Sequence, residues 1–137
     1  MKLCITTTGR DLDSSVDERF GRASYFLIID TETMKFEAVR NTAQTAGRGA
    51  GIGAAQIISD KGADALLTGV VGPNAFAALK AANIKIYEGA SGADSVRDAV
   101  EKFKNGEYKE ASAPSGGTGY GWGRGRGLGY GRGRGKW

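Results

Sequence analysis

Strand-like and helix-like segments alternate along the second half of the chain. Apolar residues recur at helical spacing in residues 52–61, 73–82 and 95–105, and short apolar runs of strand length lie between them at 63–69 and 84–89. Pro73 suits the first turn of a helix. Two strands that are joined by a helix pair in parallel, through a right-handed crossover. The alternation therefore restricts this half of the chain to an α/β fold.

The first half of the chain adds three strands, and two of them form a hairpin. Residues 2–8 are rich in β-branched side chains, 24–30 are nearly all apolar, and 34–40 alternate between polar and apolar. The short polar link between the last two favours antiparallel pairing. We therefore predict an α/β fold of ribonuclease H-like topology, with a five-stranded mixed sheet of strand order 3-2-1-4-5 and three flanking helices. Ile52, Ala55 and Ile58 are expected to share the buried face of the first helix.

Glycine is concentrated at the end of the chain. Eleven of the 23 glycines lie in residues 115–137, where they alternate with arginine and aromatic residues, and both tryptophans, Trp122 and Trp137, are there. The net charge of +4 is made up of +5 in this segment and −1 in residues 1–114. Because ordering so much glycine costs conformational entropy, we predict a domain at 1–110 and a disordered tail at 111–137. Arginine interleaved with aromatic residues suits binding to nucleic acid, to a partner protein or to an inorganic anion.

Missing residue types restrict the chemistry of the chain. Histidine is absent and Cys4 is the single cysteine, so a Ser/His/Asp or Cys/His triad and a Cys/His zinc site are excluded. The first strand offers Cys4, Thr6 and Thr8 in place of the carboxylates that a two-metal nuclease needs. No apolar run approaches the roughly 20 residues of a membrane span, and no signal-peptide core follows Lys2. We therefore expect a cytoplasmic binding protein, neither an enzyme nor a membrane partner.

Three loops are expected to meet at the carboxyl ends of the parallel strands, where ligands bind in open α/β sheets. In the second loop, closely spaced glycines at 47–53 (GRGAGIG) precede a helix. This spacing lets backbone N–H groups approach an anion, or simply permits tight packing. Gly49-x-Gly51-x-x-Ala54 also matches a dinucleotide-binding pattern, but the next strand ends in Leu67-Thr68-Gly69, without the acid that would bind a ribose.

The other two loops offer further anion-binding groups. Arg19-Phe20-Gly21-Arg22 places two guanidinium forks beside an aromatic residue, either for an anionic ligand or as ion-pair partners of Asp17 and Glu18. The segment 69–74 is either an anion site at a helix N-terminus or a tight strand-to-helix turn. Cys4, on a strand that should be central, is either a small core residue or a metal ligand.

The order of these motifs resembles a known family. VDERFGRASYFLIID (16–30), NTAQTAGRGAGIGAAQ (41–56) and LLTGVVGPNAFAALKAANIKIYEGASG (66–92), followed by an amphipathic helix, are similar to the dinitrogenase iron-molybdenum cofactor biosynthesis family over about residues 1–110. The resemblance implies a ribonuclease H-like fold and the binding of a molybdenum- or iron-containing sulfide cluster, which is a molybdenum–copper sulfide in orange protein-like members. Many relatives have histidine at the positions of Arg19 and near Arg48, and some have cysteine at that of Val71. These differences favour retention of a polyanionic cluster by charge and backbone N–H groups instead of His or Cys ligation.

These observations predict a non-enzymatic carrier of an anionic metal–sulfur cluster, which a donor or acceptor protein would exchange. The alternative is a nucleic-acid-binding or partner-binding module that acts through the tail. In the carrier, arginines would supply charge, glycines would permit close backbone approach, and Phe20 and Val71 would form an apolar wall. The predicted cluster-binding residues are Arg19, Phe20, Gly21, Arg22, Arg48, Gly49, Gly51, Gly69, Val71, Gly72, Pro73 and Asn74. Cys4 is a further candidate for a metal–sulfur contact if the end of its strand is open.

Overall fold

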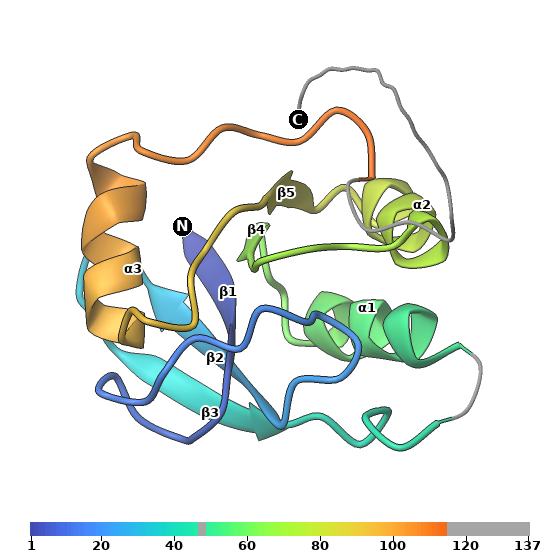
Figure 1. Cartoon of the computed structure of the whole chain (residues 1–137), viewed down its shortest axis with the longest axis horizontal. Coiled ribbons are helices and arrows are strands. Elements are labelled where there is room, and N and C mark those ends of the chain that lie inside the picture. The colour runs from blue at the N-terminus through green and yellow to red at the C-terminus, as the bar shows by residue number, and fades with distance from the viewer. Residues whose placement is uncertain (47–48, 115–137) are drawn as a thin grey trace.

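The computed structural model describes residues 1–46 and 49–114, and within them it shows the predicted α/β fold (Figure 1). The strands are β1 (Lys2–Thr7), β2 (Tyr25–Asp30), β3 (Phe36–Arg40), β4 (Ala65–Leu67) and β5 (Lys85–Tyr87). The helices are α1 (Ala50–Asp60), α2 (Pro73–Ala81) and α3 (Val96–Lys104). Arg48 and the predicted tail beyond residue 114 lie outside the described residues, and the ribonuclease H-like assignment stays a prediction.

The five strands form one mixed sheet with the predicted order, β3-β2-β1-β4-β5. β1 is central: it pairs antiparallel with β2 and parallel with β4, so that Cys4 lies between Ile28 and Leu66. β2 and β3 form the expected antiparallel hairpin, and β4 and β5 pair in parallel. Consequently the carboxyl ends of β1, β4 and β5 lie at the same edge of the sheet.

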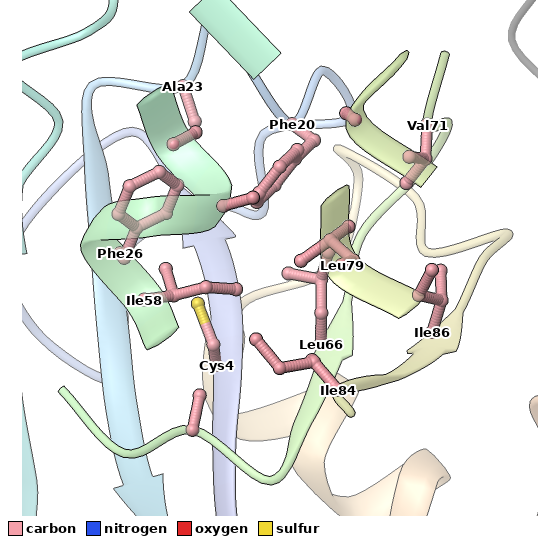
Figure 2. Packing of buried hydrophobic residues seen from close by; sticks show 14 of the residues in the cluster. Cys4, Phe20, Ala23, Phe26, Ile58, Leu66, Val71, Leu79, Ile84 and Ile86 are labelled. Carbon is pink, nitrogen blue, oxygen red and sulfur yellow. The ribbon is translucent and has the colours of Figure 1, made fainter. Parts of the chain in front are cut away.

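Alternate residues of the strands face two separate apolar cores, as a pleated sheet requires. Figure 1 shows α1 and α2 on one side of the sheet and α3 on the other. The core under α1 and α2 contains Cys4, Phe26 and Leu66, and part of it is drawn in Figure 2. The core under α3 contains Leu3, Ile5, Leu27, Leu67 and the buried helix residues Val96, Ala99 and Val100.

The predicted buried face of the first helix was wrong at one position. Ile52 is 49% exposed, whereas the buried residues of α1 are Ala50, Ala54, Ala55 and Ile58. The helix begins two residues before Ile52, and its buried residues follow the 3.6-residue period from Ala50. That period places Ile52 on the other side of the helix.

After α3 the described chain crosses to the β5 edge of the sheet, and Figure 1 shows this orange segment reaching α2. Glu110 forms an isolated bridge with Tyr87, and the Ala111 N–H donates to the Ile86 carbonyl at 2.7 Å. Lys80, in the last turn of α2, lies 3.9 Å from the Glu110 carboxylate. The predicted domain boundary at residue 110 falls within this crossing. None of the helices in the described ranges has the length and apolar character of a membrane span.

Candidate functional site

A pocket of about 350 Å³ opens where α1 and α2 begin. All three loops that were expected to converge contribute to its lining: residues 19–22, 49–52 and the turn that leads into α2. Nine of the predicted cluster-binding residues line it, namely Arg19, Phe20, Gly21, Arg22, Gly49, Gly51, Gly72, Pro73 and Asn74. Four further lining residues were not predicted: Ala50, Ile52, Val70 and Ala75.

Two helix N-termini form one side of this pocket. Both N-cap residues, Gly49 and Gly72, are glycines that provide no capping side chain, and neither helix has an acidic residue in its first turn. Within the described residues, the amides of Asn74 and Ala75 have no hydrogen-bond acceptor. The partial positive charge of each helix end therefore faces a pocket whose described lining holds no carboxylate; at α2 the Glu88 carboxylate, which accepts the Val71 N–H one residue before the N-cap, offsets part of that charge. Since the charged lining residues are both arginines, the pocket favours an anion.

Close backbone packing brings the two helix ends together. A Cβ atom added at Gly51 would lie 2.7 Å from the Ala75 Cβ atom, and one added at Gly21 would lie 2.9 Å from the Gly51 nitrogen. Both distances are shorter than a carbon contact allows. Tight packing and anion binding, which the sequence leaves as alternatives, are therefore compatible at this site, because the glycines allow the two N-termini to face one space.

Side-chain hydrogen bonds hold the 19–24 segment against the loop that follows β3. Arg22 Nη1 donates to the carbonyls of Gln44 at 2.8 Å and Ala46 at 2.7 Å. Asn41, only 2% exposed, donates from Nδ2 to the carbonyls of Gly21 at 3.1 Å and Ala23 at 2.8 Å. Arg22 thus positions the loop as well as adding charge. Sequence reasoning missed Asn41, although asparagine next to a strand end often bonds to nearby backbone.

Arg19 presents its charge at the rim of the pocket. Its side chain is 68% exposed, with Nε 3.6 Å from Asp17 Oδ1, so the ion pair with Asp17 that was considered as an alternative is present. An exposed pair of this length contributes little to stability and leaves the guanidinium accessible. Glu18 has a different partner: its carboxylate accepts the Gly92 N–H at 2.7 Å.

The apolar part of the site differs from the prediction in one valine. Val70 is 46% exposed and lines the pocket, whereas Val71 is 1% exposed and packs in the core. The Val71 N–H donates to the Glu88 carboxylate at 2.8 Å. Phe20 lies beneath the pocket at 2% exposure, with its ring 5.8 Å from that of Phe26.

Two other predicted residues lie outside the pocket lining. At Gly69, an added Cβ atom would lie 2.5 Å from the Glu18 Cβ atom, so this glycine permits packing against the 17–18 segment. Cys4 is fully buried, and Figure 2 shows its sulfur pointing toward Ile58 among carbon atoms. Burial raises the pKa of the Cys4 thiol. The open strand end that a metal–sulfur contact required is therefore not present, and no cluster of three or more His, Cys, Asp or Glu residues suited to a metal ion occurs in the described ranges.

Comparison with known proteins agrees with this architecture. The apo form of the orange protein from Desulfovibrio gigas is 46% identical, covers 84% of this chain and 96% of its own, and superposes with a TM-score of 0.81. A NifB-like protein of the DUF35 family from Thermotoga is 38% identical over 84% of this chain and 98% of its own, with a TM-score of 0.71. An uncharacterized protein from Methanocaldococcus jannaschii is 25% identical over 72% of this chain and 84% of its own. The family model described as dinitrogenase iron-molybdenum cofactor matches residues 1–106, and the chain therefore belongs to this family.

Proposed function

We propose that this chain is a non-enzymatic binding or carrier protein for an anionic metal–sulfur cluster, which occupies the pocket between the starts of α1 and α2. The cluster would be an iron–molybdenum, iron–sulfur or molybdenum–copper sulfide, passed on to an acceptor protein. One observation carries the proposal: two uncapped helix N-termini and two arginines surround a space whose described lining contains no carboxylate. Family membership supports the same class of ligand.

The lining also suits a cluster whose outer atoms are sulfide; this bound cluster, or a thiometallate used in its place, is called the guest below. Sulfide ligands are large and weakly hydrated, so they tolerate apolar neighbours such as Ile52 and Val70 while accepting N–H hydrogen bonds. No described lining residue is a histidine, cysteine, aspartate or glutamate. The cluster is therefore held by charge-assisted hydrogen bonds and contact, without a bond from protein to metal.

Replacement of Arg19 tests this reading with a matched control. Arg97, on α3, is also exposed and also pairs with one carboxylate, Asp13, at 3.3 Å, but it lies on the other side of the sheet. Tetrathiomolybdate, with and without Cu(I), would be dialysed anaerobically against the full chain and quantified by metal analysis. We expect R19A to lower affinity by about tenfold, the value of one charge-assisted contact, and R97A to leave it unchanged.

A third variant separates charge from ligation. R19H installs the histidine found in many relatives, which is mostly neutral at pH 8. If charge holds the guest, R19H binds at pH 8 as weakly as R19A. Affinity of R19H at or above that of the unmodified chain would support metal ligation instead, and equal binding by R19A and R97A would remove Arg19 from the site.

A further inference from the structure

A carboxylate contacts the turn that leads into α2. Glu88 directly follows β5, is partly buried, and accepts the Val71 N–H at 2.8 Å. Val71 immediately precedes the N-cap of α2, so the negative charge lies next to the positive end of that helix. Glu88 is not among the lining residues, but its carboxylate binds the same turn from which Val70 and Gly72 line the pocket.

Backbone hydrogen bonds on both sides of Glu88 hold it in this place. The Thr68 N–H donates to the Tyr87 carbonyl at 3.0 Å, and the Gly89 N–H donates to the Gly69 carbonyl at 3.1 Å. The chain after β5 therefore runs beside the chain that enters the turn, and it continues the parallel pairing of β4 with β5. Because the backbone is fixed, the charge of Glu88 stays at one distance from the pocket.

The charge of Glu88 opposes that of the lining. The two arginines and the two helix N-termini attract an anionic guest, whereas a carboxylate nearby repels it. We propose that Glu88 is a specificity-determining residue, which weakens the hold of the pocket on its guest in proportion to the negative charge of the guest. The inference rests on the proposed function and adds release to it, because a carrier must also hand its cargo over.

Coulomb's law gives the size of this effect. With roughly 10 Å between the carboxylate and the centre of the guest and a water-like dielectric, each unit of guest charge changes affinity by about twofold. Glu88 should therefore weaken binding of a dianion by about fourfold and of a monoanion by about twofold. Because the Glu88 carboxylate is partly buried, salt screens it less than it screens an exposed charge.

The variant E88Q removes the charge and keeps the hydrogen-bond acceptor, since the glutamine Oε1 atom can accept the Val71 N–H. Tetrathiomolybdate, a dianion, would be dialysed anaerobically against the full chain and quantified by metal analysis. We expect E88Q to bind it about fourfold more tightly than the unmodified chain, and to release it correspondingly more slowly. A gain in affinity is diagnostic, because loss of a merely structural contact would weaken binding.

A probe of lower charge tests the dependence on guest charge. Tetrathiorhenate has the same tetrahedral shape as tetrathiomolybdate and nearly the same size, but it carries a single negative charge. We expect E88Q to bind it only about twofold more tightly, so that the gain for the dianion is the square of the gain for the monoanion. A change in the shape of the pocket would instead alter the affinity for both probes equally.

Three further variants serve as controls. E37Q removes one carboxylate charge elsewhere: Glu37 pairs at 2.7 Å with Lys61, which follows the last turn of α1, at the other end of that helix from the pocket. It should leave both affinities unchanged, because salt screens a charge at that distance. E88D keeps the charge on a shorter side chain and should bind like the unmodified chain. E88A is a second neutral variant, so that a folding defect of E88Q, checked by urea denaturation, does not decide the result.

The outcomes separate the two proposals. If the neutral variants bind tetrathiomolybdate no more tightly than the unmodified chain does, Glu88 does not limit affinity, and this inference is overturned while the carrier function stands. Equal gains for the two probes, or a gain in E88D, would also overturn it, because the effect would not follow charge. If neither the unmodified chain nor the neutral variants bind either probe, both proposals fail.

Discussion

The contact between the first turns of α1 and α2 should set both stability and guest binding, and G51A tests it. A methyl group at Gly51 would lie 2.7 Å from the Ala75 Cβ atom, which is attached directly to backbone and cannot rotate away. Carbon atoms need about 3.5–4.0 Å, so the helix ends must separate by about 1 Å. Overpacking of this kind costs about 1–3 kcal/mol, partly offset by about 0.5–1 kcal/mol from replacing glycine in a helix. We expect a net loss of about 1–2 kcal/mol and weaker guest binding.

The double variant G51A/A75G distinguishes a clash at this contact from any other cause of the lost stability and binding in G51A. Without the Ala75 methyl group, the nearest neighbour of the new Cβ atom would be the residue 75 Cα atom at 3.6 Å, an ordinary contact. A75G alone should cost about 1 kcal/mol, from glycine in a helix. Urea denaturation and thiometallate dialysis of all four forms give the coupling, which we expect to be about 2 kcal/mol in favour of the double variant, with affinity restored. Additive effects, within about 0.5 kcal/mol, would refute the reasoning.

Further predictions concern Asn41, the two valines and the buried Cys4. N41A should lose about 2–3 kcal/mol of unfolding free energy in urea titrations, because the buried carbonyl of Ala23 and the part-buried carbonyl of Gly21 lose their donor, and N41Q should not restore it. V71S should destabilise by about 2–3 kcal/mol, whereas V70S should change stability by less than about 0.5 kcal/mol and lower thiometallate affinity; the reverse pattern would contradict their placement. Native Cys4 should resist iodoacetamide until the chain unfolds, since its thiol is buried with a raised pKa. Because the unfolded thiol ionises near pH 9 and the native one stays protonated, the unfolding free energy should fall more steeply above pH 9 in the unmodified chain than in C4A.

The sheet could be predicted from sequence because its signals are periodic. The short polar link between two strand-like runs indicated the hairpin, and the alternation of strand and helix required parallel pairing of β4 with β5 and of β1 with β4. The convergence of the three loops followed from the same topology, since parallel strands present their carboxyl ends together. These inferences depend only on the order and chain direction of the strands and helices, and not on where any one side chain points.

Side-chain orientation near the turns could not be predicted in this way. Val70 and Val71 are identical neighbours in the turn after β4, and only the packing of the folded turn, in which Val71 joins the core and Val70 stays 46% exposed, decides which of them faces the pocket. The same limit applies to Ile52, whose side depends on whether α1 begins at residue 50 or 52. Arg22 was predicted as a source of charge. Its hydrogen bonds to the carbonyls of Gln44 and Ala46 could not be predicted, because they depend on where the folded chain places that loop.

The three segments that line the pocket are far apart in the chain and meet only in the finished fold. A cluster bound there, as proposed, would be a ligand of the native state alone, so its binding free energy would add to the resistance of the protein to heat and proteases. An emptied carrier would then be degraded sooner than a loaded one, and the lifetime of the protein would follow its supply of cargo.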